Sequence, residues 1–213
     1  MVALAVSILV IVVCSSLLGR VEQVPGWEGR LFSSTNGLPD GVRLAVVPIM
    51  HVGTVLAIAA AALFFVAINR RRTAVVVVAA GYGAYLIARF AKLFYGRARP
   101  GELLADITLR DTVSGLGFPS GHSAVSMALV LAVLPYLSWR WRWALLAIPL
   151  VVGFARVYVG AHLPLDVVAG WAIGAFAASG VHLILGVPNH APDGQAVAAR
   201  ASSRRLDPSR PEG

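Results

Sequence analysis

The sequence is poor in charge and in cysteine. Only 13% of its 213 residues are Asp, Glu, Lys or Arg, whereas 58% are apolar and the mean hydropathy is +0.77. Soluble domains carry roughly 25% charged and about 45–50% apolar residues, so an ordinary cytosolic enzyme and a disordered protein are excluded. Cys14 is the single cysteine, which excludes an intrachain disulfide scaffold. The composition therefore predicts one integral membrane domain.

Lysine is also scarce, because the 18 basic residues include one lysine, Lys92. A net charge of +8 would suggest nucleic acid as the partner of a soluble protein. Here the arginines lie mostly between apolar runs, and the Trp/Arg segment 138–143 is typical of an anchor at the membrane interface. We therefore predict no nucleic-acid partner and expect membrane lipids around the chain.

Six apolar runs reach the roughly 17–25 residues that a membrane-spanning helix needs. They are Val2–Leu18, Leu44–Ile68, Thr73–Phe94, Ser120–Leu137, Trp143–Val159 and Leu165–Val187. The first run lacks a basic leader and a small-residue cleavage site, so we predict a retained span. The sequence thus predicts an all-α membrane domain of six spans over residues 1–187. The tail 188–213 is basic, and its Pro, Ser, Ala and Gly content is typical of disorder.

Arginines in the short loops predict the orientation of these spans. The turn Asn69–Arg72, the turn with Arg140 and Arg142, and the tail are all basic. With six spans these segments share one side, and positive residues favour the cytoplasm. Both termini are therefore expected in the cytoplasm, and the opposite side receives residues 19–43, 95–119 and 160–164.

Polar side chains that are costly in a membrane collect at this opposite side. Lys92 and Arg99 are seven residues apart at the end of the third span. A continuing helix would place them on one face, about 10 Å apart along its axis. A lysine supplies a point charge and an arginine a planar fork for phosphate oxygens, so the pair is expected to hold one anion.

The motif that opens the fourth span predicts a second part of this anion site. Pro119 suits the first turn of a helix, which would leave the amides of Ser120, Gly121 and His122 free. Free amides at a helix N-terminus bind anions, and a glycine allows close approach. His122 adds a titratable group that can donate a proton.

A third segment carries a histidine and a carboxylate at helical spacing. Pro164 suits the start of the sixth span and places Asp166 in its first turn, from which the carboxylate can reach His162. Such a contact fixes the tautomer of an imidazole and stabilises its cation. An anion cradle with a nucleophile, an orienting acid and a proton donor describes phosphoryl transfer through a phosphohistidine.

The three segments together resemble a known signature. Residues Lys92–Pro100, Pro119–His122 and Arg156–Asp166 resemble the motifs K-x6-R-P, P-S-G-H and S-R-x5-H-x3-D of the type 2 phosphatidic acid phosphatase (PAP2) family. The resemblance extends from Lys92 to Gly174, and six spans fit the membrane members of that family. It implies metal-independent dephosphorylation of lipid phosphates or diphosphates.

The resemblance also implies a role for each residue. His162 is the implied nucleophile, His122 the general acid, and Asp166 the partner of His162. The implied phosphate ligands are Lys92, Arg99, Ser120, Gly121 and Arg156. No cofactor is expected, and no His or carboxylate cluster has the spacing of metal ligands. Ala155 stands where the family usually has serine, so a hydroxyl contact to phosphate is missing or supplied elsewhere.

The substrate and two other protein classes stay open at this point. By analogy with small bacterial members, a polyprenyl diphosphate at the extracytoplasmic face of the plasma membrane is favoured. Phosphatidylglycerophosphate and phosphatidic acid are compatible alternatives. A vanadium-dependent haloperoxidase shares the anion cradle but is soluble and much larger. A non-catalytic lipid-phosphate binder or transporter would not need both His122 and His162.

Several other polar residues are expected to have no part in the chemistry. We expect Arg89 and Arg97 to extend to the lipid headgroups, and Cys14 to be a small buried residue. Three histidines without a charged partner at useful spacing are interpreted as satisfied structural residues: His51, His182 and His190. Four charged residues between the first two motifs are expected in a solvated loop: Glu102, Asp106, Arg110 and Asp111.

Overall fold

The computed structural model describes residues 2–18 and 24–187, and the regular secondary structure of these residues is entirely helical. The helices are α1 (Val2–Leu18), α2 (Gly26–Asn36), α3 (Val42–Met50), α4 (Val55–Ala67), α5 (Arg71–Tyr95), α6 (Pro100–Leu103), α7 (Gly121–Val133), α8 (Trp139–Tyr158) and α9 (Pro164–Leu185). Two 3-10 turns, η1 (His51–Gly53) and η2 (Leu134–Tyr136), follow α3 and α7. The predicted all-α class is confirmed over this part of the chain. The predicted tail and His190 lie outside the described residues.

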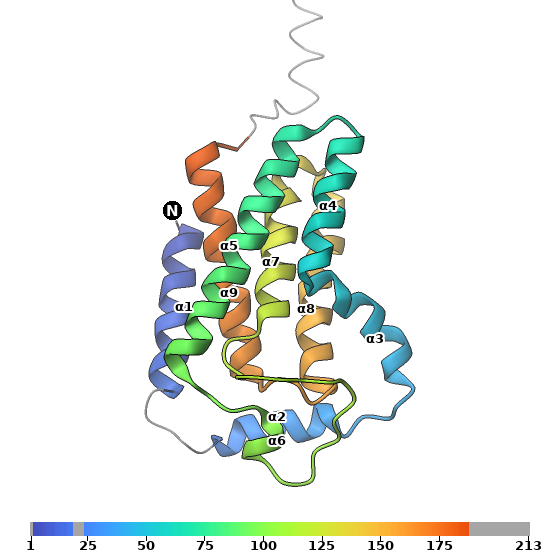
Figure 1. Cartoon of the computed structure of the whole chain (residues 1–213), viewed down its shortest axis with the longest axis vertical. Coiled ribbons are helices and arrows are strands. Elements are labelled where there is room, and N and C mark those ends of the chain that lie inside the picture. Colours follow the sequence, from blue (N-terminus) through green and yellow to red (C-terminus); the bar gives the residue numbers. More distant parts are fainter. Residues whose placement is uncertain (1, 19–23, 188–213) are drawn as a thin grey trace, which may run out of the picture.

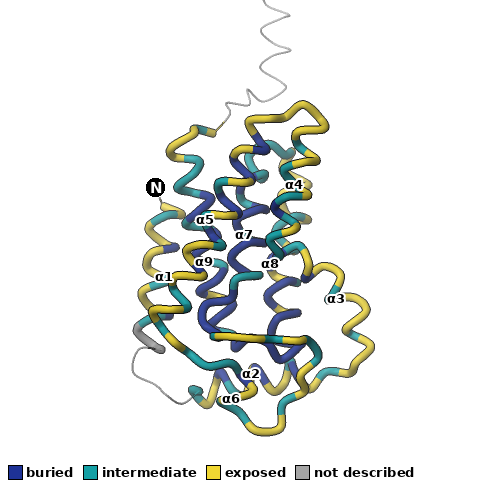
Figure 2. Tube along the Cα trace, in the orientation of Figure 1, coloured by how far each residue is buried: buried dark blue, intermediate teal, exposed yellow. Residues whose placement is uncertain are grey.

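The long helices form a bundle around α7 (Figure 1). Helix α7 packs against α9, α5 and α8, while α1 packs against α9 and α4 against α5. Helices α2 and α6 lie across the lower end of the bundle in this view, and α3 extends to its side. Buried residues follow α7 and the sides of the helices that face it (Figure 2). The start of α7 is therefore enclosed by its neighbours.

Small residues allow these helices to approach closely. Alanines at every fourth position of α5 and α7 are buried in the main core: Ala80, Ala84, Ala88, Ala124, Ala128 and Ala132. On α9, a Cβ added at Gly170 would collide with the carbonyl of Ser120, and one at Gly174 with the carbonyl of Ala124. Close packing through small residues four apart is typical of membrane helices. It fixes the first turn of α7 against the first turns of α9.

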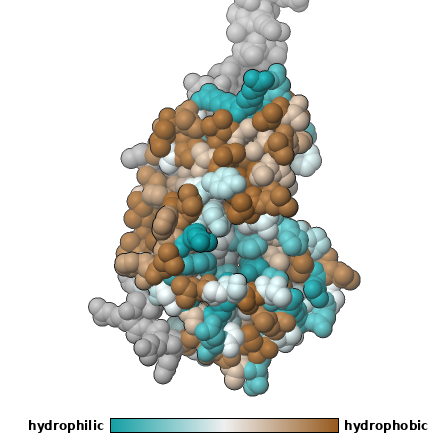
Figure 3. All heavy atoms as spheres, in the orientation of Figure 1, coloured by the Kyte–Doolittle hydropathy of each residue, from teal (hydrophilic) through white to brown (hydrophobic). Residues whose placement is uncertain are grey.

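Among the described residues, three helical segments are long and apolar enough to cross a membrane: Arg71–Leu103, Trp139–Tyr158 and Pro164–Leu185. The pair Val42–Gly53 and Val55–Ala67 adds a fourth if it counts as one bent span, while Val2–Ser15 and Gly121–Tyr136 are shorter apolar helices. All six predicted runs thus contain helix, and three or four qualify by length and composition. Apolar side chains cover much of the upper half of the visible side, and hydrophilic groups lie at the upper end and across much of the lower half (Figure 3).

The apolar run Leu44–Ile68 does not form one continuous helix, because the helix breaks and bends by 71°. Thr54 has extended backbone angles (φ −86°, ψ 159°), and its hydroxyl accepts a hydrogen bond from the amide of Ala57 at 3.3 Å. Thr54 is thus an N-cap that starts a new helix. The break also brings Gly53 against the backbone of His122.

The basic segments and the polar motifs lie at opposite ends of the bundle. The α4–α5 turn, the α7–α8 turn and the end of α9 are at the upper end in Figure 1. The loop that follows α6 and the α8–α9 turn are at the lower end, where α2 and α6 also lie. Within the described residues, the two basic turns therefore lie at the end opposite the polar motifs, as the sequence predicts.

Candidate active site

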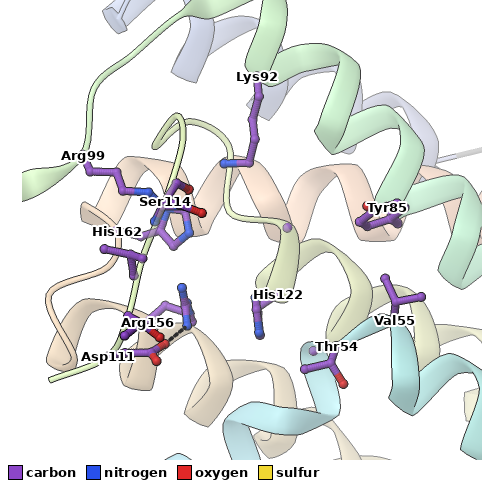
Figure 4. Close-up of a pocket in the computed structure, with 14 residues that line it drawn as sticks. Thr54, Val55, Tyr85, Lys92, Arg99, Asp111, Ser114, His122, Arg156 and His162 are labelled. Carbon is purple, nitrogen blue, oxygen red and sulfur yellow. Dashed lines mark hydrogen bonds and ion pairs between the residues drawn. The ribbon is translucent and has the colours of Figure 1, made fainter.

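A cavity of about 350 Å³ lies at the lower end of the bundle. Six of the eight residues singled out from the sequence line it: Lys92, Arg99, Gly121, His122, Arg156 and His162. They come from the end of α5, the chain that follows it, the start of α7, the end of α8 and the α8–α9 turn (Figure 4). The remaining two, Ser120 and Asp166, are fully buried behind its wall.

Lys92 and Arg99 meet at the cavity, although not on one continuous helix as predicted. Helix α5 ends at Tyr95 because Gly96 adopts the left-handed conformation (φ 62°), which a glycine adopts without strain. The Lys92 ammonium donates hydrogen bonds to the carbonyls of Leu116 (2.7 Å) and Gly117 (2.9 Å). The Arg99 guanidinium donates to three carbonyls, each at 2.8 Å: Ser114, Gly115 and Ala161. Both cations therefore hold the loop that borders the cavity.

The first turn of α7 presents two backbone donors. The amides of Gly121 and His122 have no hydrogen-bond partner among the described residues. The expectation of a third free amide is wrong, because the Ser120 amide donates to the carbonyl of Asp166 at 2.8 Å. The Ser120 hydroxyl caps α7 and contacts the Ser123 hydroxyl at 3.0 Å. It therefore does not face the cavity.

Arg156 is held in the last turn of α8 and is only 4% exposed. Its Nη1 donates to Oδ2 of Asp111 at 2.9 Å (Figure 4), while its buried Nε has no partner in the described part of the chain. The expectation that Asp111 is a solvated loop residue is wrong, since its side chain lines the cavity and is 31% exposed. Ala155 packs beside Val46 and Met50 in a core cluster and does not line the cavity.

His162 lies against Asp166, the contact that the sequence predicts. Its Nδ1 is 3.4 Å from Oδ2 of Asp166, a close contact in which no hydrogen bond is formed. Pro164 starts α9 and places Asp166 in its first turn. Burial lowers the pKa of His162 well below its ordinary value, and the nearby cations, Arg156 first, lower it further. The imidazole is therefore neutral at neutral pH and keeps a lone pair for nucleophilic attack.

Arg97 is a buried ion-pair partner, so the expectation that it extends to the headgroups is wrong. Its side chain is 10% exposed and donates to Asp166 at 2.9 Å and to Glu28 at 2.7 Å. Glu28 is fully buried, and sequence reasoning missed it. The available signal was its register with Phe32 and Asn36, because positions i, i+4 and i+8 form the buried face of α2.

The other charged residues divide into two groups. Arg89, Glu102 and Asp106 are exposed, and His51 is exposed near the cavity. The expectation that Arg110 lies in a solvated loop is wrong, since it pairs with Asp40 at 2.7 Å and donates to three carbonyls.

His182 contacts the carbonyl of Leu131 at 3.2 Å, and Cys14 is buried as expected. Within the described residues no group of three or more His, Cys, Asp or Glu could hold a metal ion.

The profile of the PAP2 superfamily matches residues 72–188. Because this match covers more than half of the chain and contains all eight candidate residues, the chain belongs to the PAP2 superfamily. The family that the three motifs resemble is thereby confirmed.

Two relatives and one solved structure extend this assignment. The chain is 32% identical over 95 residues to an undecaprenyl-diphosphatase from Sulfolobus acidocaldarius, covering 44% of this chain and 46% of that protein. It is 36% identical over 96 residues to a lipid A 1-phosphatase from Rhizobium johnstonii, covering 43% of this chain and 39% of that protein. The chain thus spans less than half the length of these curated relatives.

The fold is similar to that of the first transmembrane PAP2 type phosphatidylglycerolphosphate phosphatase from Bacillus subtilis. The two structures superpose with a TM-score of 0.67 at 17% identity, over 99% of this chain and 100% of that one. Together with the apolar helices described above, this likeness supports an all-helical integral membrane protein.

Proposed function

We propose that the chain is a phosphatase that hydrolyses a lipid phosphate or diphosphate through a phosphohistidine. One observation carries this proposal. A single cavity joins three cationic side chains with two histidines, one of which is backed by a carboxylate. The cations suit a phosphate group, and the histidines suit nucleophilic attack and proton donation. The relatives named as an undecaprenyl-diphosphatase and a lipid A 1-phosphatase support a lipid substrate.

In this proposal the phosphate binds between Lys92, Arg99 and Arg156. The buried Nε of Arg156 lacks an acceptor, and such a donor gains by meeting a phosphate oxygen. The amides of Gly121 and His122 supply two further donors at a helix N-terminus. The phosphate would replace the loop carbonyls and the Asp111 carboxylate that now hold these cations. A Ser120 contact would require its hydroxyl to turn from Ser123.

The proposed chemistry proceeds in two displacements. Nε2 of His162 attacks phosphorus while the bond to the leaving oxygen breaks, and His122 gives that oxygen a proton. Water then gives a proton to His122 and attacks the phosphohistidine, and the bond between phosphorus and Nε2 breaks. This step releases phosphate and restores both histidines. Asp166 orients the imidazole and stabilises its positive charge. Three cations stabilise the charge of the transferring phosphoryl group, so the mechanism requires no metal and no cofactor.

A polyprenyl diphosphate is the proposed substrate, since one relative bears the name undecaprenyl-diphosphatase. Phosphatidylglycerophosphate and phosphatidic acid are the alternatives, together with a phosphorylated saccharolipid like that named in the second relative. Each presents a phosphate at the membrane surface and an apolar chain within it. A panel of these lipids, compared by kcat/KM, distinguishes them.

We also propose six spans with both termini in the cytoplasm of a bacterium and the cavity at the extracytoplasmic face. The separation of the basic turns from the cavity end supports this orientation. In a chain with Cys14 replaced, Asp106→Cys should react with an impermeant thiol reagent in intact cells and Arg71→Cys should not. Both positions are exposed. The reverse labelling pattern would contradict the orientation.

Phosphate release by the purified protein in detergent tests the function directly. We expect release from at least one lipid of the panel, survival of activity in EDTA, and inhibition by orthovanadate, which can adopt a five-coordinate form like the transferring group. Loss in EDTA that Mg²⁺ restores would contradict the metal-free mechanism. Binding without release would indicate a lipid-phosphate binder, and vanadate-dependent bromide oxidation would indicate a haloperoxidase.

A further inference from the structure

A buried ion-pair network lies behind the cavity and joins three segments far apart in the sequence. Arg97 donates from Nη2 to Oε2 of Glu28 at 2.7 Å and from Nη1 to Oδ1 of Asp166 at 2.9 Å. Both carboxylates are fully buried. Glu28 comes from α2, which lies across the end of the bundle (Figure 1). The sequence K-x6-R-P does not specify Arg97, and no motif contains Glu28.

Glu28 also holds the first turn of α9 directly. Its Oε1 accepts a hydrogen bond from the amide of Leu165 at 2.9 Å, across 137 positions of sequence. The neighbouring residue, Asp166, accepts at Oδ2 from the amide of Leu163 at 2.9 Å. Two carboxylates thus cap the start of α9, where unpaired amides need acceptors. One of them comes from outside the helix.

These contacts fix how Asp166 faces His162. Oδ1 of Asp166 is bound by Arg97, so Oδ2 is the atom left to face Nδ1 of His162, at 3.4 Å. With both carboxyl groups ionised, one guanidinium shared between them leaves a net negative charge in the network. If Glu28 were neutral, Arg97 would balance Asp166 alone, and less negative charge would face the imidazole.

We propose that Glu28 and Arg97 are positioning residues that act on His162 through Asp166. Glu28 holds the guanidinium and shares its charge, Arg97 fixes the plane of the Asp166 carboxylate, and the carboxylate holds the proton of His162 at Nδ1. Nε2 is then free to face the cavity. The catalytic consequence rests on the proposed function, whereas the effect on the imidazole does not.

The test compares Glu28→Gln with Asp40→Asn in the full chain. Both replacements turn an arginine-bound carboxylate into an amide, but Asp40 is 85% exposed, and its partner Arg110 keeps three carbonyl contacts. The first readout is the ¹⁵N chemical shifts of His162, assigned by their absence in His162→Ala. The second readout is kcat and KM for phosphate release. Arg97→Lys, which keeps the charge and loses the fork, serves as a second variant if Glu28→Gln does not fold.

We expect Glu28→Gln to reduce the Nδ1-protonated form of His162, and Asp40→Asn to leave it unchanged. We expect kcat to fall about 10- to 100-fold with little change in KM, since a misplacement of about 1 Å can cost ~100-fold. Unchanged His162 shifts in a folded Glu28→Gln or Arg97→Lys chain would overturn the inference, whatever the activity. If Glu28→Gln alters the His162 shifts but the wild-type chain releases no phosphate, the positioning role is supported and the proposed phosphatase function is overturned.

Discussion

Arginines occur at both ends of the helix bundle, but they differ in burial and in bonding partners. At the cavity end, Arg97, Arg99 and Arg156 are largely shielded from solvent and bind carboxylates or carbonyls. At the opposite end, Arg71 and Arg140 are exposed in the first turns of α5 and α8. A buried charge requires partners, whereas an arginine at an interface keeps its head in water. Partners and burial, rather than residue type, therefore distinguish the candidate site.

Histidine and glycine show the same contrast. His162 is 2% exposed and faces a carboxylate, whereas His182, near the end of α9, contacts a carbonyl. Gly53 lies against His122, whereas Gly180 has open space beside it. Arginine, histidine and glycine can thus each be replaced near the cavity and far from it. The variant far from the cavity controls for the general effect of the substitution.

Replacing the two histidines should give the largest difference. His162→Ala removes the proposed nucleophile, so we expect no turnover of any substrate. His182→Ala loses one contact to the carbonyl of Leu131 and should retain nearly all activity. The turnover of both variants is measured as phosphate release, and thermal unfolding checks that each variant is folded. Turnover by a folded His162→Ala chain would contradict the assigned nucleophile.

His122→Ala should have a large effect that depends on the substrate. A general acid contributes roughly 10²–10⁴-fold for a poor leaving group, such as a lipid alkoxide. It contributes much less for para-nitrophenyl phosphate, whose phenolate leaves unaided, and a diphosphate should fall between them. Rates of the variant on the three substrates give the comparison. Equal losses on all three would mean that His122 is not the general acid.

Replacing arginines at the two ends should give the next largest difference. Arg156→Gln removes a cation from the proposed phosphate site, and we expect kcat to fall by about 10²–10³-fold, as for one donor to a developing oxyanion. Arg71→Gln changes an exposed residue and should leave kcat unchanged. Steady-state kinetics with an aryl phosphate gives kcat for both variants and the wild-type chain. Similar losses in both variants would show that total charge, and not the cavity, sets the rate.

Glycine replacement should give a smaller loss. A Cβ at position 53 would lie 2.5 Å from the carbonyl oxygen of His122 and 2.7 Å from its Cβ, so Gly53→Ala must displace the start of α7 or η1. We expect kcat to fall about 10-fold, because misplacement of a catalytic group by a fraction of an ångström is costly. Gly180→Ala, with open space around it, should be neutral. Equal activity of the two variants would show that η1 does not position His122.

Much of the candidate site could be predicted from sequence because it depends on local spacing. Lys92, Arg99 and His162 stand in ordered motifs, and Asp166 follows His162 at helical distance. The helical class follows from long apolar runs. Each of these signals lies within one short segment, so no knowledge of the packing is required.

The missed features depend on contacts between distant segments. Glu28 is buried because α2 folds back over the start of α9, and its bond to Leu165 spans 137 positions. Asp111 meets Arg156 only because the loop after α6 turns into the cavity. The break at Thr54 interrupts an apolar run whose composition predicts one continuous helix. Periodicity can indicate that Glu28 lies on the buried face of α2, but neither composition nor periodicity identifies the distant partners of these residues.

The smallest expected effect is a change in the pH dependence of kcat/KM, which reports the free enzyme. Burial and nearby cations lower the pKa of His162, so the nucleophile should stay neutral, and kcat/KM high, well into the acid range. Removing the Arg156 charge takes away the first of those cations and should raise the pKa of His162. Protonation would then disable the nucleophile at higher pH, and the acid limb of the residual activity of Arg156→Gln should move toward neutral pH. Arg71→Gln should leave the acid limb in place.

The wild-type chain and both variants are assayed with the same aryl phosphate, so the ionisation of the substrate cancels from the comparison. An acid limb that moves equally in both variants, or in neither, would show that the cations of the cavity do not control the protonation of His162.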